Sequence, residues 1–328
     1  KQRHADYYAP LNGAGSITLL SQIAIPVLLQ CHHAAQNKRI SVRLAGGTDV
    51  SFSPPLDHLE QVMLPLLATH FGADASVAVA KRGYFPRGGG DVELSVLPST
   101  LRPLHLVDAG QLVCVKAIIR TFGYASSSVL ADTAHLVRGM SLPGDQSGGG
   151  KSSKEVPIEI EQYAHFSVTA QEGRTAEGAG GGRDNASETN TGSSGNSGGK
   201  RKQKNKRRRA KKKTPTTFSI QLVATTSTGC FLSANASGQK VGNEKDIVLR
   251  AIHELESLIA SGSCADEHTQ DQLVIFMAMA EGTSTLRCST PKMSKHADTA
   301  MHFAALLTGA KFEVTDEDNG TRNITCSR

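Results

Sequence analysis

One order of predicted elements occurs twice in this sequence, and this repetition restricts the fold more than any other feature. The first copy predicts, in order, a helix at 16–30, strand at 40–44, helix at 56–67, strand at 75–80, turn at 88–90 and strand at 92–97. The second copy predicts a helix at 271–280, strand at 284–288, helix at 298–307, strand at 311–314, turn at Asn319–Gly320 and strand at 323–326. Two such copies predict an α/β (α+β) core of similar units, each a sheet with helices packed on one face.

A different pattern lies between the two copies. It predicts strands at 112–120 and 158–161, a third strand from the alternation of Phe218, Ile220 and Leu222, and helices at 127–137 and 247–259. We therefore expect three parts: residues 1–100 and 263–328 form the repeated core, and residues 101–262 form a small inserted α/β domain.

Within the insert, residues 169–217 contain no Val, Ile, Leu, Met, Phe or Tyr. A segment without apolar side chains cannot offset the entropy of ordering, so we expect it to be disordered. Its second half, residues 200–213, holds 11 of the 36 Lys and Arg residues, and removing these leaves 25 basic against 30 acidic residues, a net charge of −5. The basic pI therefore belongs to one tract, whose composition is typical of a nuclear localisation signal or of non-specific binding to RNA backbone. We favour the first, and expect the protein in the nucleus (nucleoplasm or nucleolus), with the cytoplasm as a second compartment.

Several classes of protein are disfavoured by composition. The chain has no run of 18 apolar residues, so we expect no membrane span. None of its six cysteines forms a CxxC pair, which favours a reducing compartment over a disulfide framework. Nothing in the sequence indicates an obligate protein partner.

His296 lies just ahead of the predicted helix at 298–307. The backbone N–H groups and the dipole of a helix N-terminus favour a bound anion, and an imidazole that faces a bound phosphate can act as a nucleophile. Local sequence by itself favours the plainer interpretation, a surface histidine on a loop.

Two other positions allow both a structural and a ligand-binding interpretation. Asp271, followed by Gln272, opens an apolar run, where a carboxylate either caps the helix or binds a ligand. Gln22 interrupts the apolar helix predicted at 16–30, either as a satisfied buried amide or as a ligand contact.

Two blocks of sequence resemble the RNA 3′-terminal phosphate cyclase family. The first block comprises Ala-Gly-Gly-Thr-Asp at 45–49, Pro54-Pro55 with Asp57, and Arg-Gly-Tyr-Phe-Pro-Arg-Gly-Gly-Gly at 82–90; the second comprises Glu267, His268, Asp-Gln-Leu at 271–273, and His296 with Thr299. They occur in the family's order, and the resemblance covers the chain outside its low-complexity middle. The family is built from such repeats and normally has more of them, so we expect its N-terminal glycine-rich segment and phosphate-binding basic residues to be missing from this chain.

The resemblance implies a function and a site. In such a cyclase, ATP with Mg²⁺ or another divalent cation adenylylates the histidine, here His296. AMP then passes to the 3′-terminal phosphate of an RNA, which closes to a 2′,3′-cyclic phosphate. The nucleotide contacts that it implies are Gln22, Pro54, His268, Asp271 and Gln272, and it assigns no metal ligand. His268 stands where the family often has a tyrosine, which implies weaker stacking on adenine.

Alternatives to an active cyclase stay open, namely a cyclase-like protein without catalysis and a defective fragment of a cyclase. Cyclase-like proteins that act in ribosomal RNA maturation lack the nucleophile, and His296, Asp271 and Gln272 speak against that class. In the glycine-rich segment, Arg82 and Arg87 fit either a tight hairpin or contacts to RNA phosphate, and we favour the hairpin.

The basic tract gives a prediction about location. Deleting residues 200–213 should move a fluorescent fusion of the protein from the nucleus to the cytosol, because these residues hold the concentrated positive charge that serves as the address. Fluorescence microscopy measures the distribution, and thermal unfolding checks that the deletion leaves the fold intact. Unchanged nuclear fluorescence would mean that the localisation signal lies elsewhere in the chain.

Overall fold

The computed structural model describes residues 6–32, 38–123, 127–143, 156–165, 216–239, 242–288, 294–317 and 320–328. These residues belong to one compact unit, Lys1–Phe166 with Pro215–Arg328. The segment expected to be disordered, 169–217, and the basic tract 200–213 lie outside the described residues, except for Thr216 and Thr217. Thr217 is the first residue of a strand, so the predicted segment was too long at its C-terminal end.

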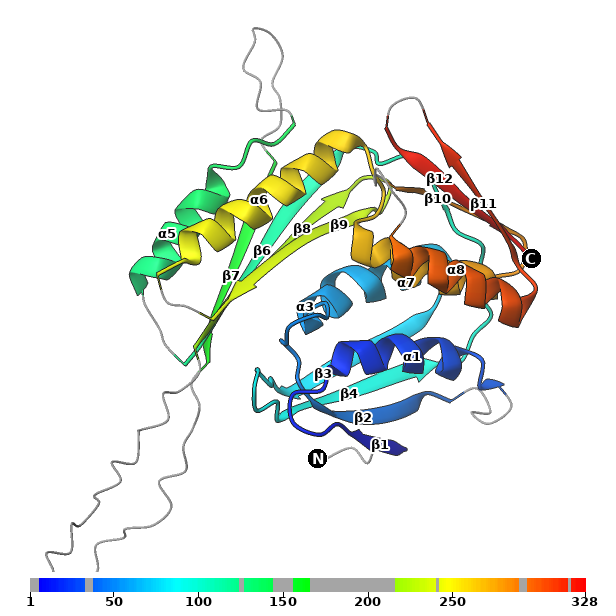
Figure 1. Ribbon diagram of the computed structural model, residues 1–328, viewed down its shortest axis with the longest axis horizontal. Helices are drawn as coiled ribbons and strands as arrows, with labels where there is room; N and C mark the ends of the chain where they lie inside the picture. Colours follow the sequence, from blue (N-terminus) through cyan, green and yellow to red (C-terminus); the bar gives the residue numbers. More distant parts are fainter. Residues whose placement is uncertain are drawn as a thin grey trace, which may run out of the picture. The chain divides into compact units, whose positions relative to one another are not determined.

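The first repeat unit is a four-stranded sheet covered by helices (Figure 1). Its elements are β1 (Tyr7–Pro10), α1 (Ile17–Leu29), β2 (Ile40–Gly46), a continuous helical stretch over residues 56–71, β3 (Asp74–Lys81) and β4 (Gly90–Leu97). The helical stretch consists of α3 (Leu56–His58), a π-helical turn η1 (Leu59–Met63), α4 (Leu64–Leu66) and a second π-helical turn η2 (Leu67–Phe71). The strand order is β1-β2-β4-β3, with β1 parallel to β2 and the other pairs antiparallel.

The second unit repeats this arrangement. Its elements are β5 (His105–Leu106), α7 (Glu267–Met279), β10 (Thr283–Cys288), α8 (Lys295–Thr308), β11 (Lys311–Asp316) and β12 (Arg322–Ser327). The strand order β5-β10-β12-β11 matches that of the first unit, again with one parallel pair at the edge and antiparallel pairs elsewhere. The α+β class and the repeated order of elements predicted from the sequence are confirmed, and each unit gains a short edge strand that the sequence pattern did not show.

The segment between the two units forms a third sheet, with strand order β7-β6-β8-β9. Its strands are β6 (Leu112–Phe122), β7 (Ile158–His165), β8 (Thr217–Thr226) and β9 (Phe231–Gly238), and its helices are α5 (Ser127–Arg138) and α6 (Glu244–Ser261). Both helices cover the same face of the sheet in Figure 1, and their apolar sides form a hydrophobic cluster separate from that of the two repeats. β5 lies in the range predicted for the insert but pairs with β10, so the pairing places it with the second repeat; the domain limits themselves stay predictions.

Two helices of the second unit begin earlier than the sequence pattern predicted. The first turn of each helix is polar, and a prediction from apolar residues begins only at the first apolar run. The predicted starts are therefore too late. Asp266 caps α7, its side chain accepting a hydrogen bond from the Thr269 N–H, so the interpretation of Asp271 as the cap is wrong. Ser294 caps α8 in the same way through the Ala297 N–H, which places His296 in the first turn of the helix and not on the loop before it.

The Asp266 cap also joins the insert to the core. One of its oxygens accepts hydrogen bonds from the N–H and the hydroxyl of Ser233 on β9, at 3.1 and 2.8 Å, and from the Thr269 hydroxyl at 2.9 Å. The other oxygen accepts from the Thr269 N–H at 2.8 Å and lies 3.9 Å from the His58 ring. Burial would raise the pKa of this carboxyl, but the neighbouring His58 ring and the donors from Thr269 and Ser233 lower it to about 2.

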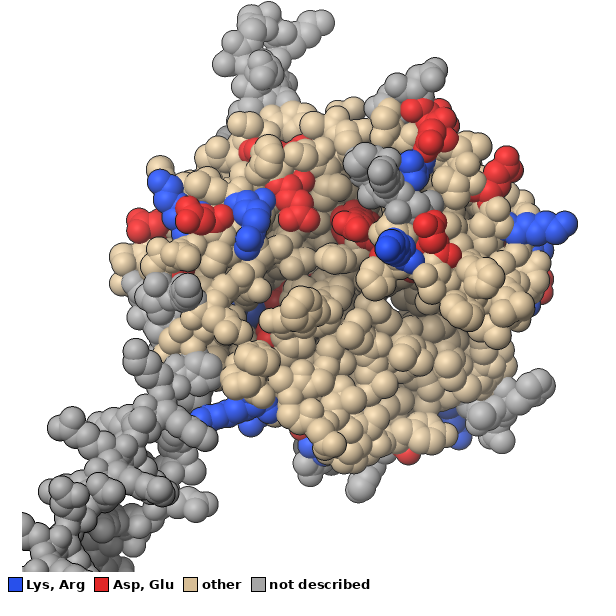
Figure 2. Space-filling view, viewed as in Figure 1, with Lys and Arg blue, Asp and Glu red and all other residues tan. Residues whose placement is uncertain are grey.

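The outer faces of α1 and α8 carry exposed apolar side chains. These are Ile23 and Val27 on α1, and Phe303, Leu306 and Leu307 on α8. The surface over α1 and over the C-terminal part of α8 shows almost no charged side chains in Figure 2. No helix among the described residues is long and apolar enough to cross a membrane.

The Asp266 cap gives a prediction about stability. Asp266→Ala should lower the free energy of unfolding by about 3 kcal/mol, since it removes a helix cap and leaves the buried Ser233 donors without a partner. Urea unfolding measures the change. Ser16→Ala is the matched control, because Ser16 caps α1 through the Leu19 N–H at a half-buried position; it should cost about 1 kcal/mol. Equal costs at the two caps would contradict the bridging role of Asp266.

The same cap predicts a pH dependence with a defined sign. A carboxyl whose pKa falls from about 3.9 when unfolded to about 2 when folded contributes its full stability above pH 4. That contribution is lost as the pH falls from 4 toward 2. The difference in unfolding free energy between the wild type and Asp266→Ala should therefore shrink over this window. A difference that stays constant down to pH 2 would contradict the low pKa.

Candidate active site

All six residues singled out as candidate site residues line one cavity of about 610 Å³. They are Gln22, Pro54, His268, Asp271, Gln272 and His296. They come from both repeat units and from positions up to 274 residues apart in the chain (296 minus 22). The structure thus brings the whole predicted set together.

Each unit contributes one helix side and one helix N-terminus to this cavity. α7 places His268, Asp271 and Gln272 on one side, because residues three and four apart share a helix face. α1 contributes Gln22, half-buried among apolar neighbours. Pro54 precedes α3, and its carbonyl is fixed by a 2.8 Å hydrogen bond from the Thr18 hydroxyl. The cavity is therefore walled by regular elements, with one loop, residues 50–54, closing a side.

Asp271 connects α7 to the start of α8. The Ser294 hydroxyl donates to the Asp271 carboxylate at 2.8 Å and also accepts from the Ala297 N–H at 3.0 Å, so one side chain both caps α8 and holds Asp271. Burial raises the pKa of the Asp271 carboxyl, although the Ser294 hydrogen bond opposes the rise. This arrangement fixes the turn that carries His296 against the helix that carries the other polar residues.

His296 is exposed at the cavity, as the second residue of α8. His296 belongs to the first turn of α8, where the backbone N–H groups have no carbonyl partner within the helix; Ser294 caps that of Ala297. A helix N-terminus favours a bound phosphate, and His296 is the second residue of this helix. The arrangement can therefore support attack by the imidazole on phosphorus.

Phe52 at the same cavity was not singled out from the sequence. Its φ of 63° lies in the left-handed region, which a bulky residue rarely adopts, and its side chain is wholly exposed. Strained positions of this kind cluster at ligand sites. No pattern in the sequence indicates this, because a backbone angle cannot be recognised from an ordinary Ser-Phe-Ser segment.

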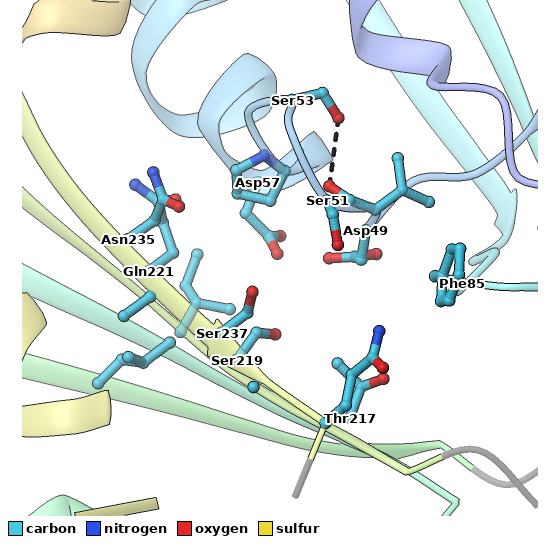
Figure 3. Close-up of a pocket in the computed structure, with 17 residues that line it drawn as sticks. Asp49, Ser51, Ser53, Asp57, Phe85, Thr217, Ser219, Gln221, Asn235 and Ser237 are labelled. Atoms are coloured by element: carbon cyan, nitrogen blue, oxygen red, sulfur yellow. Dashed lines mark hydrogen bonds between the residues drawn. The ribbon is translucent and has the colours of Figure 1, made fainter. Parts of the chain in front are cut away.

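A second cavity of about 360 Å³ adjoins the first. Both are lined by Val50, Ser51, Ser53, Asn235 and Ser237, so the loop after β2 and the strand β9 form their common wall. Figure 3 shows the second cavity, in which the carboxylates of Asp49 and Asp57 face the hydroxyls of Ser219 and Ser237. The insert therefore supplies one wall of a site whose other walls belong to the core.

A buried cluster of charges lies beside this second cavity. The Asp57 carboxylate accepts from Arg120 at 2.6 and 2.7 Å and from Arg82 at 2.8 Å, and Arg82 also donates to Glu60 at 2.7 Å. Burial would raise the pKa of the Asp57 carboxyl, but the hydrogen bonds and charges of the two arginines outweigh burial and lower it. For Asp49, which is 3.7 Å from Arg82, burial prevails and the pKa is raised. Because Arg82 is engaged in this cluster, the structure favours its structural role over the contact to RNA phosphate.

Sequence reasoning missed Arg120, Gln221 and Asn235. The only signal for Arg120 was a charged residue inside an apolar strand, and the partner that explains it is 63 residues away. Gln221 and Asn235 occupy adjoining strands, but β9 itself had not been predicted.

Comparison with known proteins decides the family. A family model described as RNA 3′-terminal phosphate cyclase matches residues 1–314. The chain belongs to the RNA 3′-terminal phosphate cyclase family. This is a family of ATP-dependent enzymes of the ligase type, and the resemblance found in the sequence is confirmed.

Three curated relatives show how much of a cyclase this chain spans. It is 28% identical to the RNA 3′-terminal phosphate cyclase of Drosophila melanogaster, a match that covers 98% of this chain and 73% of the relative. It is 28% identical to a Dictyostelium discoideum protein named "Probable RNA 3′-terminal phosphate cyclase", covering 95% of this chain and 60% of the relative. It is 26% identical to the RNA 3′-terminal phosphate cyclase of Staphylothermus marinus, covering 94% and 70%.

The buried cluster gives a prediction about this cyclase family member. Arg120→Met should lower the free energy of unfolding by about 3–5 kcal/mol, because it removes a bidentate partner of the buried Asp57. Arg43→Met is the matched control, since Arg43 also binds a carboxylate, that of Asp91, through two hydrogen bonds, but its side chain is 47% exposed where Arg120 is 8%. In urea unfolding, the control should leave the midpoint almost unchanged. Similar shifts for the two variants would contradict the importance of burial.

Proposed function

We propose that this protein converts the 3′-terminal phosphate of an RNA to a 2′,3′-cyclic phosphate, using ATP and a histidine–AMP intermediate on His296. One observation carries the proposal: His296, at the N-terminus of α8, and the five other candidate residues line a single cavity. Family membership supports the same reaction class.

The first step joins AMP to His296. The imidazole lone pair attacks the α-phosphorus of ATP, a P–N bond forms, and the bond to pyrophosphate breaks with its electron pair leaving on pyrophosphate. Gln22, Pro54, His268, Asp271 and Gln272 would bind and orient the nucleoside part, through polar contacts to sugar and base and by packing against the base.

The next steps use the activated phosphate. An oxygen of the RNA 3′-phosphate attacks the phosphorus of the histidine–AMP, which releases His296 and forms a mixed anhydride. The neighbouring 2′-hydroxyl then attacks the RNA phosphorus, and AMP leaves. Activation is needed because oxide is a poor leaving group from a phosphate monoester, whereas AMP is a good one.

The described residues fit ATP better than they fit a protein-bound metal. The cavity volume is within the range that holds small ligands. Among the described residues, no group of three or more His, Cys, Asp or Glu side chains could hold a metal ion. We therefore propose that Mg²⁺ or a similar cation, which would neutralise phosphate charge, is held mainly by the phosphates of ATP.

His296→Asn tests the proposal. Asparagine is polar and of similar size but offers no comparable nucleophile, so the variant should lose all transfer of label from [α-³²P]ATP to the protein. Its unfolding temperature should stay within about 1 °C, since an exposed residue contributes little to the core. Gel separation of labelled protein, with acid lability as the sign of a P–N bond, measures the transfer.

The control is His302→Asn, an exposed histidine on the same helix, nearly two turns beyond His296 and not among the residues that line the cavity. It should retain the label. If the wild-type full-length protein forms no adenylate, the enzyme proposal fails and a role like that of the non-catalytic cyclase-like proteins takes its place. Label that persists in His296→Asn would move the nucleophile to another residue.

A further inference from the structure

The second cavity contains two buried acceptors without partners. Asp49 is 9% exposed and Gln221 is 2% exposed. Neither Oδ1 of Asp49 nor Oε1 of Gln221 accepts a hydrogen bond from any residue that the structure describes. Leaving a buried acceptor unpaired is costly, so such atoms call for an explanation.

Both side chains line the cavity from opposite sides. Asp49 lies at the end of the Gly-Gly-Thr-Asp turn after β2, where its other oxygen accepts from the Thr48 hydroxyl. Gln221 lies on β8, where its amide nitrogen makes one long hydrogen bond of 3.4 Å to the Leu222 carbonyl. Neither oxygen is thus needed by the fold, and both are available to a ligand in the cavity.

The rest of the lining defines the ligand's chemistry. Hydroxyl and amide groups line one side, namely those of Thr217, Ser219, Asn235, Ser237 and Gln239. Phe85, partly exposed, stands at the edge (Figure 3). Two acceptors match donors such as hydroxyl and amino groups, and an aromatic ring matches the face of a base. A phosphate matches less well, because the carboxyl groups of Asp49 and Asp57 face the cavity. The two neighbouring arginines lie against acids: both bind Asp57, Arg82 also binds Glu60, and the remaining Nη1 of Arg82 lies 3.7 Å from Asp49.

We propose that this cavity binds the 3′-terminal nucleoside of the RNA, with Asp49 accepting a hydrogen bond from its 2′-hydroxyl and Gln221 accepting one from a donor on its base. The inference rests on the proposed function. Because the two cavities adjoin, the 3′-phosphate of the bound nucleoside then points toward the cavity of His296. The 2′-hydroxyl is the group that must attack, and its recognition here distinguishes an RNA end from a DNA end.

In this assignment Asp49 recognises the sugar of the terminal nucleoside, and Gln221 recognises its base. Replacing the Asp49 carboxyl affects only ends that carry a 2′-hydroxyl. Removing the Gln221 oxygen affects every end with the same base, whether ribose or deoxyribose. The two effects can be separated with one pair of ligands.

The test measures binding of two short oligonucleotides by fluorescence anisotropy at one fixed salt concentration, since backbone contacts depend strongly on salt. Both end in a 3′-phosphate, and one has 2′-deoxyribose at the last position. The wild type should bind the ribose end about tenfold more tightly, the equivalent of 1.4 kcal/mol. Equal affinities in the wild type would overturn the role of Asp49 without any variant.

Two variants complete the test. Asp49→Asn should reduce the preference for the ribose end to less than about threefold, because an amide nitrogen, which can only donate, replaces one of the two carboxyl oxygens. Gln221→Met, which keeps the side-chain length, should weaken both ends about tenfold and keep the preference. Its unfolding temperature should be unchanged or higher, because it removes a buried acceptor that has no partner in the fold.

Gln162→Met is the matched control, since Gln162 is exposed on β7 of the same sheet and lines neither cavity. It should bind both ends as the wild type does. Wild-type affinity in Gln221→Met, or an unchanged preference in Asp49→Asn, would overturn the proposal. Formation of enzyme–AMP by the wild type, measured without RNA, reports on the proposed function separately, so failure of either idea is recognised by itself.

Discussion

The buried carboxylate of Asp57 holds together three parts of the molecule that are distant in sequence. It stands at the start of α3, and its partners are Arg82, just after β3, and Arg120, on β6 of the insert. A carboxylate at this depth is stable only when paired, so the two arginines and the acid require one another. Because the loop that leads into α3 walls both cavities, this one cluster fixes where the core and the insert meet around the site.

Two helix caps complete the framework on the opposite wall. Asp266 starts α7 and binds Ser233 of the insert, while Ser294 starts α8 and binds Asp271 of α7. Each capping side chain accepts a hydrogen bond from an N–H group that has no partner within its helix. Each also makes a hydrogen bond to a neighbouring element. The position of His296 thus follows from the chain of contacts β9–α7–α8, all made by short side chains with little freedom to move.

The sequence contained most of the fold because hydrophobic periodicity is local. The two repeats were recognised from it, whereas the edge strands β1 and β5, too short for a pattern, and β9, with its small residues, were not. The site residues were predicted from the resemblance to a known family, whereas only the structure shows that they line one cavity. Arg120, Phe52 and Gln221 were not recognised from the sequence, because the feature that identifies each is non-local or conformational. For Arg120 this feature is a distant partner, for Phe52 a strained backbone angle, and for Gln221 an unpaired acceptor.

The repeat also relates the two halves of the site to each other. Gln22 and Gln272 are each the sixth residue of a 13-residue helix that begins after a side-chain cap. Asp57 and His296 are each the second residue of the helix that follows in its unit. One framework position thus carries an inert, charge-paired acid in one copy and an exposed imidazole in the other. The repeat thus presents the same backbone position twice, once inside a buried charge cluster and once at the exposed edge of the cavity.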